Sequence, residues 1–150
     1  MHKLFMALAV CWLAAGPAAA TDKTDVMSVV HQWVSSFNKG DMKSMVTACA
    51  DQSSIIDDFP PHEWHGAGAC SKWSGDFEAF AKSAHITSPA VIVGKPWHVD
   101  VTAEAAYVVA PASFSFAQKG KPVKENAVVT LALHKDSAGW RITGWAWADR

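Results

Sequence analysis

The first part of the chain repeats apolar residues at the spacing of an α-helix. Thr24 and Asp25 can cap a helix, and apolar residues recur every three or four positions over 26–37. The segment 38–41 (Asn-Lys-Gly-Asp) ends this helix and caps a second, shorter one, whose apolar positions run over 42–49. The pattern therefore predicts two consecutive helices before residue 50.

The pattern then changes twice before residue 83. Residues 53–56 predict a short strand, and the two prolines at 60–61 force an extended turn. We expect a glycine-rich loop with two histidines over 62–70. A third helix follows over 70–83, because its aromatic residues fall on one face.

After residue 89 the chain takes the composition of β-strands, rich in Val, Thr, Phe and Trp. Short turns separate these strands, so we expect a mostly antiparallel sheet. The predicted strands cover 90–93, 97–102, 106–117, 123–135 and 140–148. Three helices followed by such a sheet predict an α+β fold, a cone-shaped domain in which the helices pack on one face of a strongly curved sheet. The open end of such a cone is a natural small-molecule pocket.

The segment 1–20 has the composition of a signal peptide. A basic start precedes an apolar run over 4–15, and small residues typical of a cleavage site follow. The apolar run is too short to span a bilayer as a helix. A retained membrane anchor and a lipoprotein built on Cys11 are the alternatives, but the valine before Cys11 is bulkier than a lipoprotein signal requires. We expect cleavage after Ala20 and one domain over 21–150.

The charge of the mature segment argues against some partners. Removing Lys3 from 13 basic residues leaves 12 against 14 acidic ones, a net charge of −2 with neutral histidines. A nucleic-acid-binding domain would need a basic face, so we expect no nucleic-acid partner. We also expect no membrane contact after signal cleavage. Of eight tryptophans only Trp12 leaves with the signal, and so many in a small domain favour an aromatic core or cavity.

The cysteines agree with export. Cys11 leaves with the signal peptide, and an even pair remains, Cys49 and Cys70. In an oxidising compartment such a pair predicts a disulfide, with two buried free thiols as the alternative. We expect a periplasmic or secreted protein.

The order of the motifs resembles a known superfamily. An Asn-x-Gly-Asp segment at 38–41 precedes an apolar helix, then Ala50-Asp51, then a strand that ends in an acid at Asp57. The closing segment 139–145 also resembles a last strand of this type. The chain is similar here to the nuclear transport factor 2-like superfamily, with its SnoaL-like and ketosteroid-isomerase-like domains. The resemblance implies a cone fold and sheets that often pair back to back as homodimers. It leaves the activity open, because the fold hosts isomerases, dehydratases, epoxide hydrolases, cyclases and binding modules.

The resemblance also assigns roles to single residues. The aspartate base of the isomerase falls on Asp57, its tyrosine donor on Trp33, and its aspartic-acid donor near Leu131. An indole N–H at Trp33 still supplies one donor, whereas Leu131 supplies none. Steroid-type isomerisation is therefore not expected, since one such donor is typically worth about 3 kcal/mol in the transition state.

The densest group of chemically active residues comprises Asp57, Asp58, His62 and His65. Adjacent carboxylates at a strand end point to opposite faces, so we expect one of the two aspartates to face the cone. A carboxyl group in an apolar mouth has a raised pKa and suits a general base or acid, with one of the histidines as its helper. Capping of a solvated turn is the alternative. The spacing of the histidines is a weak metal signal, so we expect no metal and no cofactor.

Aromatic residues are the candidates for the wall of the pocket. We expect ligand contacts from Phe59, from Leu131 and from the tryptophans 33, 64, 73 and 147. On the last strand Trp145 and Trp147 share a face, and Trp140 joins them only if a bulge intervenes near Gly144. Core packing is the alternative for these residues.

Three functions are compatible with these features. The sequence favours an exported domain that binds a small apolar or aromatic molecule in the cone. An acid–base enzyme of the isomerase, dehydratase or hydrolase type, using Asp57 with a nearby histidine, is the alternative. A dimeric interaction scaffold without a ligand is the third.

Overall fold

The computed structural model describes residues 18–150. Most of the predicted signal peptide therefore lies outside the described residues, and only 18–20 fall inside, as the first residues of a helix. The helices are α1 (Ala18–Asn38), α2 (Met42–Thr47) and α3 (Ala69–Ser83). Within residues 18–150, none of them combines the length and hydropathy needed to cross a membrane.

Seven strands form one curled sheet, in the order β2-β1-β7-β6-β5-β3, and β4 pairs with the same edge of β5 as β3. All pairs are antiparallel except β1 with β7, which run parallel. The strands are β1 (Cys49–Ile56), β2 (Glu63–Ala67), β3 (Ile86–Val93), β4 (His98–Val101), β5 (Ala105–Gln118), β6 (Lys121–Asp136) and β7 (Gly139–Asp149). The expected α+β cone, three helices on a curved and mostly antiparallel sheet, is confirmed.

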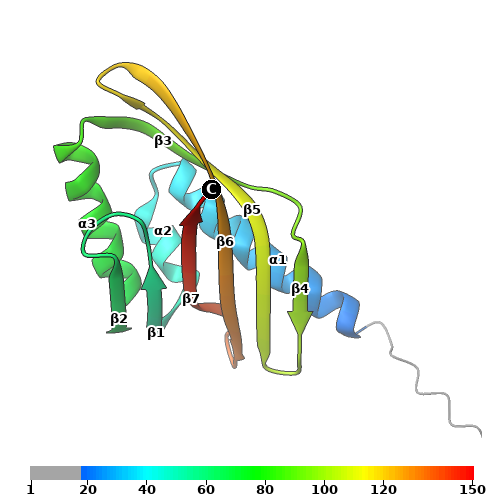
Figure 1. Cartoon of the computed structure of the whole chain (residues 1–150). Coiled ribbons are helices and arrows are strands. Elements are labelled where there is room, and N and C mark those ends of the chain that lie inside the picture. The colour runs from blue at the N-terminus through cyan, green and yellow to red at the C-terminus, as the bar shows by residue number, and fades with distance from the viewer. Residues whose placement is uncertain (1–17) are drawn as a thin grey trace, which may run out of the picture.

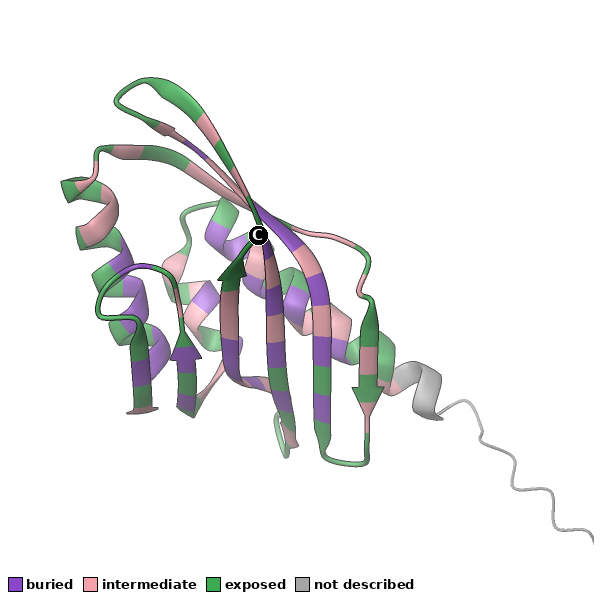
Figure 2. Ribbon diagram, viewed as in Figure 1, coloured by how far each residue is buried: buried purple, intermediate pink, exposed green. Residues whose placement is uncertain are grey.

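The helices all lie on one face of the sheet. Figure 1 shows α1, α2 and α3 on the far side of the strands and the near face uncovered. Along β5 and β6, residues facing the helices alternate with residues on the open face, and the buried bands in Figure 2 follow this alternation. The core therefore lies between the helices and the concave side of the sheet.

Two expected elements differ from the structure. The second helix ends at Thr47 rather than at Cys49, because Ala48 caps it and Cys49 already belongs to β1. The predicted loop over 62–70 contains β2, which pairs with β1 and buries Trp64 on its inner side. Glycines weaken the strand pattern of β2, so its stability comes from this pairing rather than from its composition.

A β-bulge interrupts the last strand near Gly144, the condition under which the sequence places Trp140 on the face of Trp145. The pairing of β7 with β6 shifts between Ile142 and Gly144. The extra residue brings Trp140 onto the same buried face as Trp145. Gly144 is required here, because a Cβ atom at this position would collide with the backbone carbonyl oxygen of Ser54 on β1.

A disulfide joins Cys49 at the start of β1 to Cys70 in the first turn of α3, with 6.5 Å between the two Cα atoms. The predicted bond is thus present. It fixes the beginning of α3 against the sheet, on the side of the molecule that carries the cavity described next.

Candidate functional site

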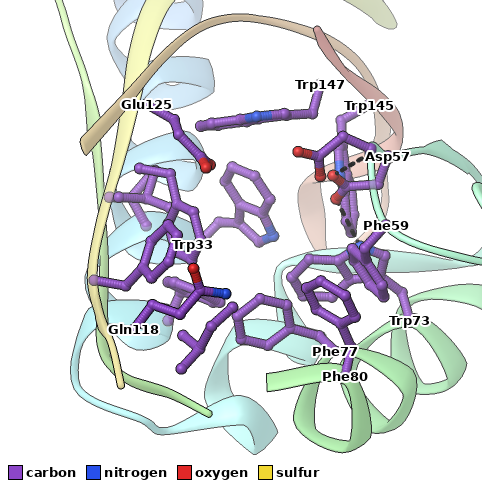
Figure 3. A pocket seen from close by; sticks show the side chains of 17 residues that line it. Trp33, Asp57, Phe59, Trp73, Phe77, Phe80, Gln118, Glu125, Trp145 and Trp147 are labelled. Atoms are coloured by element: carbon purple, nitrogen blue, oxygen red, sulfur yellow. Dashed lines mark hydrogen bonds between the residues drawn. The ribbon is translucent and has the colours of Figure 1, made fainter. Parts of the chain in front are cut away.

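A cavity of about 190 Å³ opens between α1, α3 and the curled sheet (Figure 3). Helices and strands both contribute to its wall. The end of the β5–β6 hairpin bends over the helices (Figure 1) and adds its side chains to the wall. The lining residues are Trp33, Val34, Phe37, Asp57, Asp58, Phe59, Trp73, Phe77, Phe80, Ile86, Val91, Phe114, Phe116, Gln118, Glu125, Trp145 and Trp147. The wall is therefore mainly aromatic, with four polar side chains.

The floor of the cavity is a set of aromatic rings in mutual contact. Trp33 lies 5.0 Å from Trp145, measured between ring centroids, and Trp73 stacks on Phe77 at 5.4 Å. Trp73 lies 5.3 Å from Trp145 and links the two pairs, and Phe37 lies 5.2 Å from Phe77. Rings in contact on several sides have few alternative rotamers, so the floor is preformed.

Asp57 lies directly after β1 and is half-buried in the wall. Its Oδ2 accepts a 2.8 Å hydrogen bond from the Trp73 indole, and its Oδ1 accepts a 2.9 Å bond from the backbone N–H of Asp58 (Figure 3). Both bonds hold the carboxyl group in one orientation. The end of β1 thus positions the carboxyl group, and Trp73 of α3 holds it in place.

The environment of Asp57 changes its acidity. Burial raises the pKa of its carboxyl group to about 7, and the neighbouring Asp58 side chain adds to the rise. The two N–H donors, from Asp58 and Trp73, lower the pKa and offset part of this effect. Asp57 therefore exchanges a proton near neutral pH, the range in which a general acid or base works best.

Further carboxylates surround the mouth. Asp58 and Glu125 line the cavity, and Asp149 lies close to both. Burial, together with the charges of Asp149 and Asp58, raises the pKa of Glu125, and burial followed by the charge of Asp58 raises that of Asp149. The mouth of the cavity is thus an acidic region.

Trp33 carries a polar atom that the described residues leave without a partner. The side chain is 5% exposed, and its Nε1 has no acceptor within residues 18–150. A buried donor without a partner costs about 1–3 kcal/mol. The ring of Trp33 lines the cavity, but the Nε1 atom itself has less than 1 Å² of exposed area, so a ligand acceptor would satisfy it only by entering between the surrounding rings.

The structure brings together most of the predicted site residues. Trp33, Phe59, Trp73 and Trp147 line the cavity, and so do both aspartates. The expectation that only one aspartate faces the cone is not met, because β1 ends at Ile56 and the alternation of a strand does not extend to residues 57–58.

The two histidines lie outside the cavity and are exposed. His62 Nδ1 lies 3.1 Å from the backbone oxygen of Asp57, not from its carboxyl group. His65 faces Ser54 Oγ and Glu63 Oε2, each at 3.3 Å. Neither ring reaches the wall, so a proton partner for Asp57 must come from elsewhere.

Two predicted contact residues lie behind the wall. Trp64 is buried, donates a 2.8 Å hydrogen bond to Asp76 Oδ2 and packs against Phe59. Leu131 is fully buried in the core, opposite Val108 and Trp145 in the sheet. Both support lining residues without lining the cavity themselves.

Sequence reasoning missed the contribution of the β5–β6 hairpin. Gln118 and Glu125 lie on either side of its turn and both line the cavity. The sequence marks the turn but not the bend that brings it over the helices. The helical spacing predicts that the aromatic residues of the third helix, Phe77 among them, share one face, and this face lines the cavity.

Within the described chain, no three His, Cys, Asp or Glu side chains come together in a way that could hold a metal ion. Among the described residues, the carboxyl groups of the mouth therefore do not form a metal-coordinating group.

Known proteins share this fold. The structure is similar to a nuclear transport factor 2-like superfamily protein from Salmonella enterica serovar Typhimurium, with a TM-score of 0.73 and 16% identity over 87% of this chain and 92% of that one. It is also similar to a ketosteroid isomerase-like protein from Erwinia carotovora atroseptica, with a TM-score of 0.67 and 15% identity over 85% and 95% of the two chains.

A third similar structure is a nuclear transport factor 2-like protein with a cystatin-like fold from Novosphingobium aromaticivorans (TM-score 0.73, 14% identity, 91% and 87% covered). No curated protein matches the sequence. The pattern of the SnoaL-like domain matches residues 26–146, most of the chain. The protein therefore belongs to the SnoaL-like domain family, and it shares its fold with the nuclear transport factor 2-like proteins above.

Proposed function

We propose that this domain binds a small apolar or aromatic molecule in the cavity between its helices and its sheet. The observation that carries the proposal is the preformed aromatic wall with an unpartnered N–H at Trp33. Apolar walls with a few polar groups are typical of small-molecule sites. The favoured ligand is apolar over most of its surface and carries one acceptor atom for Trp33.

The volume limits the size of the ligand. The cavity measures about 190 Å³, and an apolar cavity of about 150 Å³ accommodates benzene. A single ring with a short substituent therefore fits without rearrangement, whereas a four-ring steroid does not. Benzyl alcohol, one ring with one acceptor oxygen, is a suitable probe.

A cavity-filling variant tests the proposal. Val34 lines the cavity from α1, so Val34→Phe should occupy part of the space and weaken benzyl alcohol binding at least tenfold, measured by tryptophan fluorescence. Val29→Phe, on the same helix but outside the cavity, is the matched control and should bind as the unmodified protein does. Equal binding by all three proteins would exclude the cavity as the binding site.

A second function, acid–base catalysis, is favoured by one observation. Asp57 has a pKa near neutrality and is held by two hydrogen bonds beside an apolar space. As a carboxylate it can accept a proton from carbon, while the Trp33 N–H stabilises the oxygen of an adjacent carbonyl. This function does not require His62 or His65.

Proton exchange at carbon tests this second function. Phenylacetone in D₂O exchanges its benzylic protons when a base removes them, and ¹H NMR follows the loss of signal. If the domain catalyses the exchange, Asp57→Asn should slow it at least a hundredfold while the domain remains folded. If Asp57→Asn still catalyses the exchange, Asp57 is not the base. If the unmodified protein does not accelerate the exchange above its rate in solvent alone, binding remains the proposed function.

Export is proposed on the composition of the segment 1–20 together with the Cys49–Cys70 disulfide. Mass spectrometry of the protein from a fractionated native host should find it in the periplasm or medium, beginning at Thr21 and two hydrogens lighter than the reduced chain. A full-length cytoplasmic chain with free thiols would contradict export. Native spectra of the same sample should also reveal a small molecule that denaturation releases.

A further inference from the structure

We propose that the ligand of this cavity is an organic cation, an amine or quaternary ammonium group attached to an apolar body. The inference rests on the proposed binding function and specifies the chemical class of the ligand. It follows from the charges and the rings that face the same space.

The charged groups of the wall have one sign. Asp57, Asp58 and Glu125 line the cavity, and within residues 18–150 no lysine, arginine or histidine does. Asp149 adds a fourth carboxyl group beside Asp58 and Glu125. The described ion pairs, Lys135 with Asp22 and His65 with Glu63, leave these four carboxyl groups out.

Carboxyl groups gathered in this way lack a compensating charge. At Glu125 and Asp149, burial and the charges of neighbouring carboxylates both disfavour the ionised form. A ligand cation in the mouth would relieve the repulsion, whereas a ligand carboxylate or phosphate would increase it. Anionic ligands are therefore disfavoured.

The aromatic wall favours the same ligand. The faces of aromatic rings attract cations, Trp most strongly, and sets of rings that surround an ammonium group are a recurring recognition device. Trp33, Trp73, Trp145 and Trp147 all line the cavity, and Figure 3 shows Trp147 near Glu125. The ammonium group would lie between these rings and the carboxylates, with the apolar body on the floor.

Two probes of the same shape separate charge from shape. Phenyltrimethylammonium and tert-butylbenzene differ in replacing a charged nitrogen by carbon, and both are of the size that the cavity accepts. Fluorescence titration at pH 8 should show that the cation binds at least tenfold more tightly. Phenylacetate, an anion with one ring, should bind more weakly than either.

Charge removal at the mouth supplies the variant test. The double variant Asp58→Asn, Glu125→Gln should weaken phenyltrimethylammonium binding at least fivefold and change tert-butylbenzene binding less than twofold. Asp51→Asn, Glu78→Gln makes the same change of charge at exposed positions outside the cavity and should leave both affinities unchanged.

The outcomes distinguish this inference from the proposed function. If tert-butylbenzene binds as tightly as the cation or more tightly, and Val34→Phe weakens its binding, the cation preference is overturned and the binding function stands. Equal weakening of the cation by both double variants would also overturn it, because the attraction would then be a general effect of net charge. Binding of neither probe, together with no benzyl alcohol binding, would overturn both.

Discussion

Asp57 is the residue at which the stability of the fold and the chemistry of the cavity oppose each other. An ionised carboxylate at this position is buried beside Asp58, and two N–H donors compensate only part of the cost. An asparagine could accept only one of these two bonds, because its amide nitrogen donates. A carboxyl group with a raised pKa beside a cavity is a candidate functional group.

The pKa of Asp57 makes the stability depend on pH. The pKa is raised from 3.8 in the unfolded chain to about 7 in the fold, so the folded protein binds the proton more tightly. The stabilisation from this proton is complete below about pH 4 and is lost as the pH rises through 7. The loss is at most about 4 kcal/mol, because one pKa unit corresponds to about 1.4 kcal/mol.

Urea denaturation of Asp57→Asn and the unmodified protein between pH 4 and pH 8 measures this effect. The amide, like the protonated acid, is neutral, so the stability of the variant relative to the unmodified protein should rise between pH 4 and pH 7 and level off above pH 7. Glu125 and Asp149, whose pKa values are also raised, remain in both proteins and cancel in the comparison. A difference in stability that is constant over this range would show that Asp57 has an ordinary pKa.

The candidate site was best predicted from the sequence where a residue lies on the apolar face of a helix or directly after a strand. Asp57 follows a strand, and Trp33 and Trp73 lie on the apolar faces of helices, so periodicity placed all three at the cavity. His62 and His65 lie beyond the strand, in a segment whose turn and pairing with β1 decide where the rings point. No local pattern contains that information.

At the scale of elements, the bulge in β7 decides which tryptophans reach the interior. It allows Trp140 and Trp145 to share a face although five residues separate them. A side chain does not fit at Gly144, because the backbone of the neighbouring strand β1 lies too close at Ser54. The last strand thus depends on one glycine for its place between β1 and β6.

Gly144→Ala should therefore destabilise the domain. A methyl group here collides with the Ser54 carbonyl, part of the backbone that pairs with β7, so strands must move apart. We expect a loss of about 1–3 kcal/mol in the free energy of unfolding, measured by urea denaturation. Gly75→Ala is the control: it lies in α3 with open space around it, and should gain about 0.5–1 kcal/mol.

The order of elements was predictable because helical and strand periods differ clearly in this chain. The sequence left the bulge open, because alternation alone places Trp140 opposite Trp145. β2 was not predicted, since a five-residue strand with Gly66 inside it resembles a loop until its partner is known. The bend of the β5–β6 hairpin also escaped prediction. It depends on how a sheet twists over its helices, which no single segment encodes.

At the scale of the whole molecule, the open face of the sheet has an apolar centre. A row of uncharged side chains crosses four strands there, through Ile56, Ala146, Thr130 and Val109, which are consecutive cross-strand partners. Ile56 is 56% exposed, and Tyr107 nearby is 46% exposed. Figure 1 shows that none of the helices covers this face. Exposed apolar side chains on an uncovered sheet face make this face a candidate interface.

We propose that two copies pair through this face as a homodimer. In a two-fold arrangement each residue near the axis meets its own counterpart, so a charge placed there repels itself. Thr130→Arg, at the centre of the row, should therefore convert the dimer to a monomer and halve the mass measured by light scattering. Thr87→Arg, exposed on the edge strand β3, should leave the dimer intact.

A monomeric unmodified protein would contradict the pairing, and so would a Thr130→Arg variant that remains dimeric. The cavity opens on the helix side of the sheet, so each copy should bind its ligand independently and both proteins should have the same affinity.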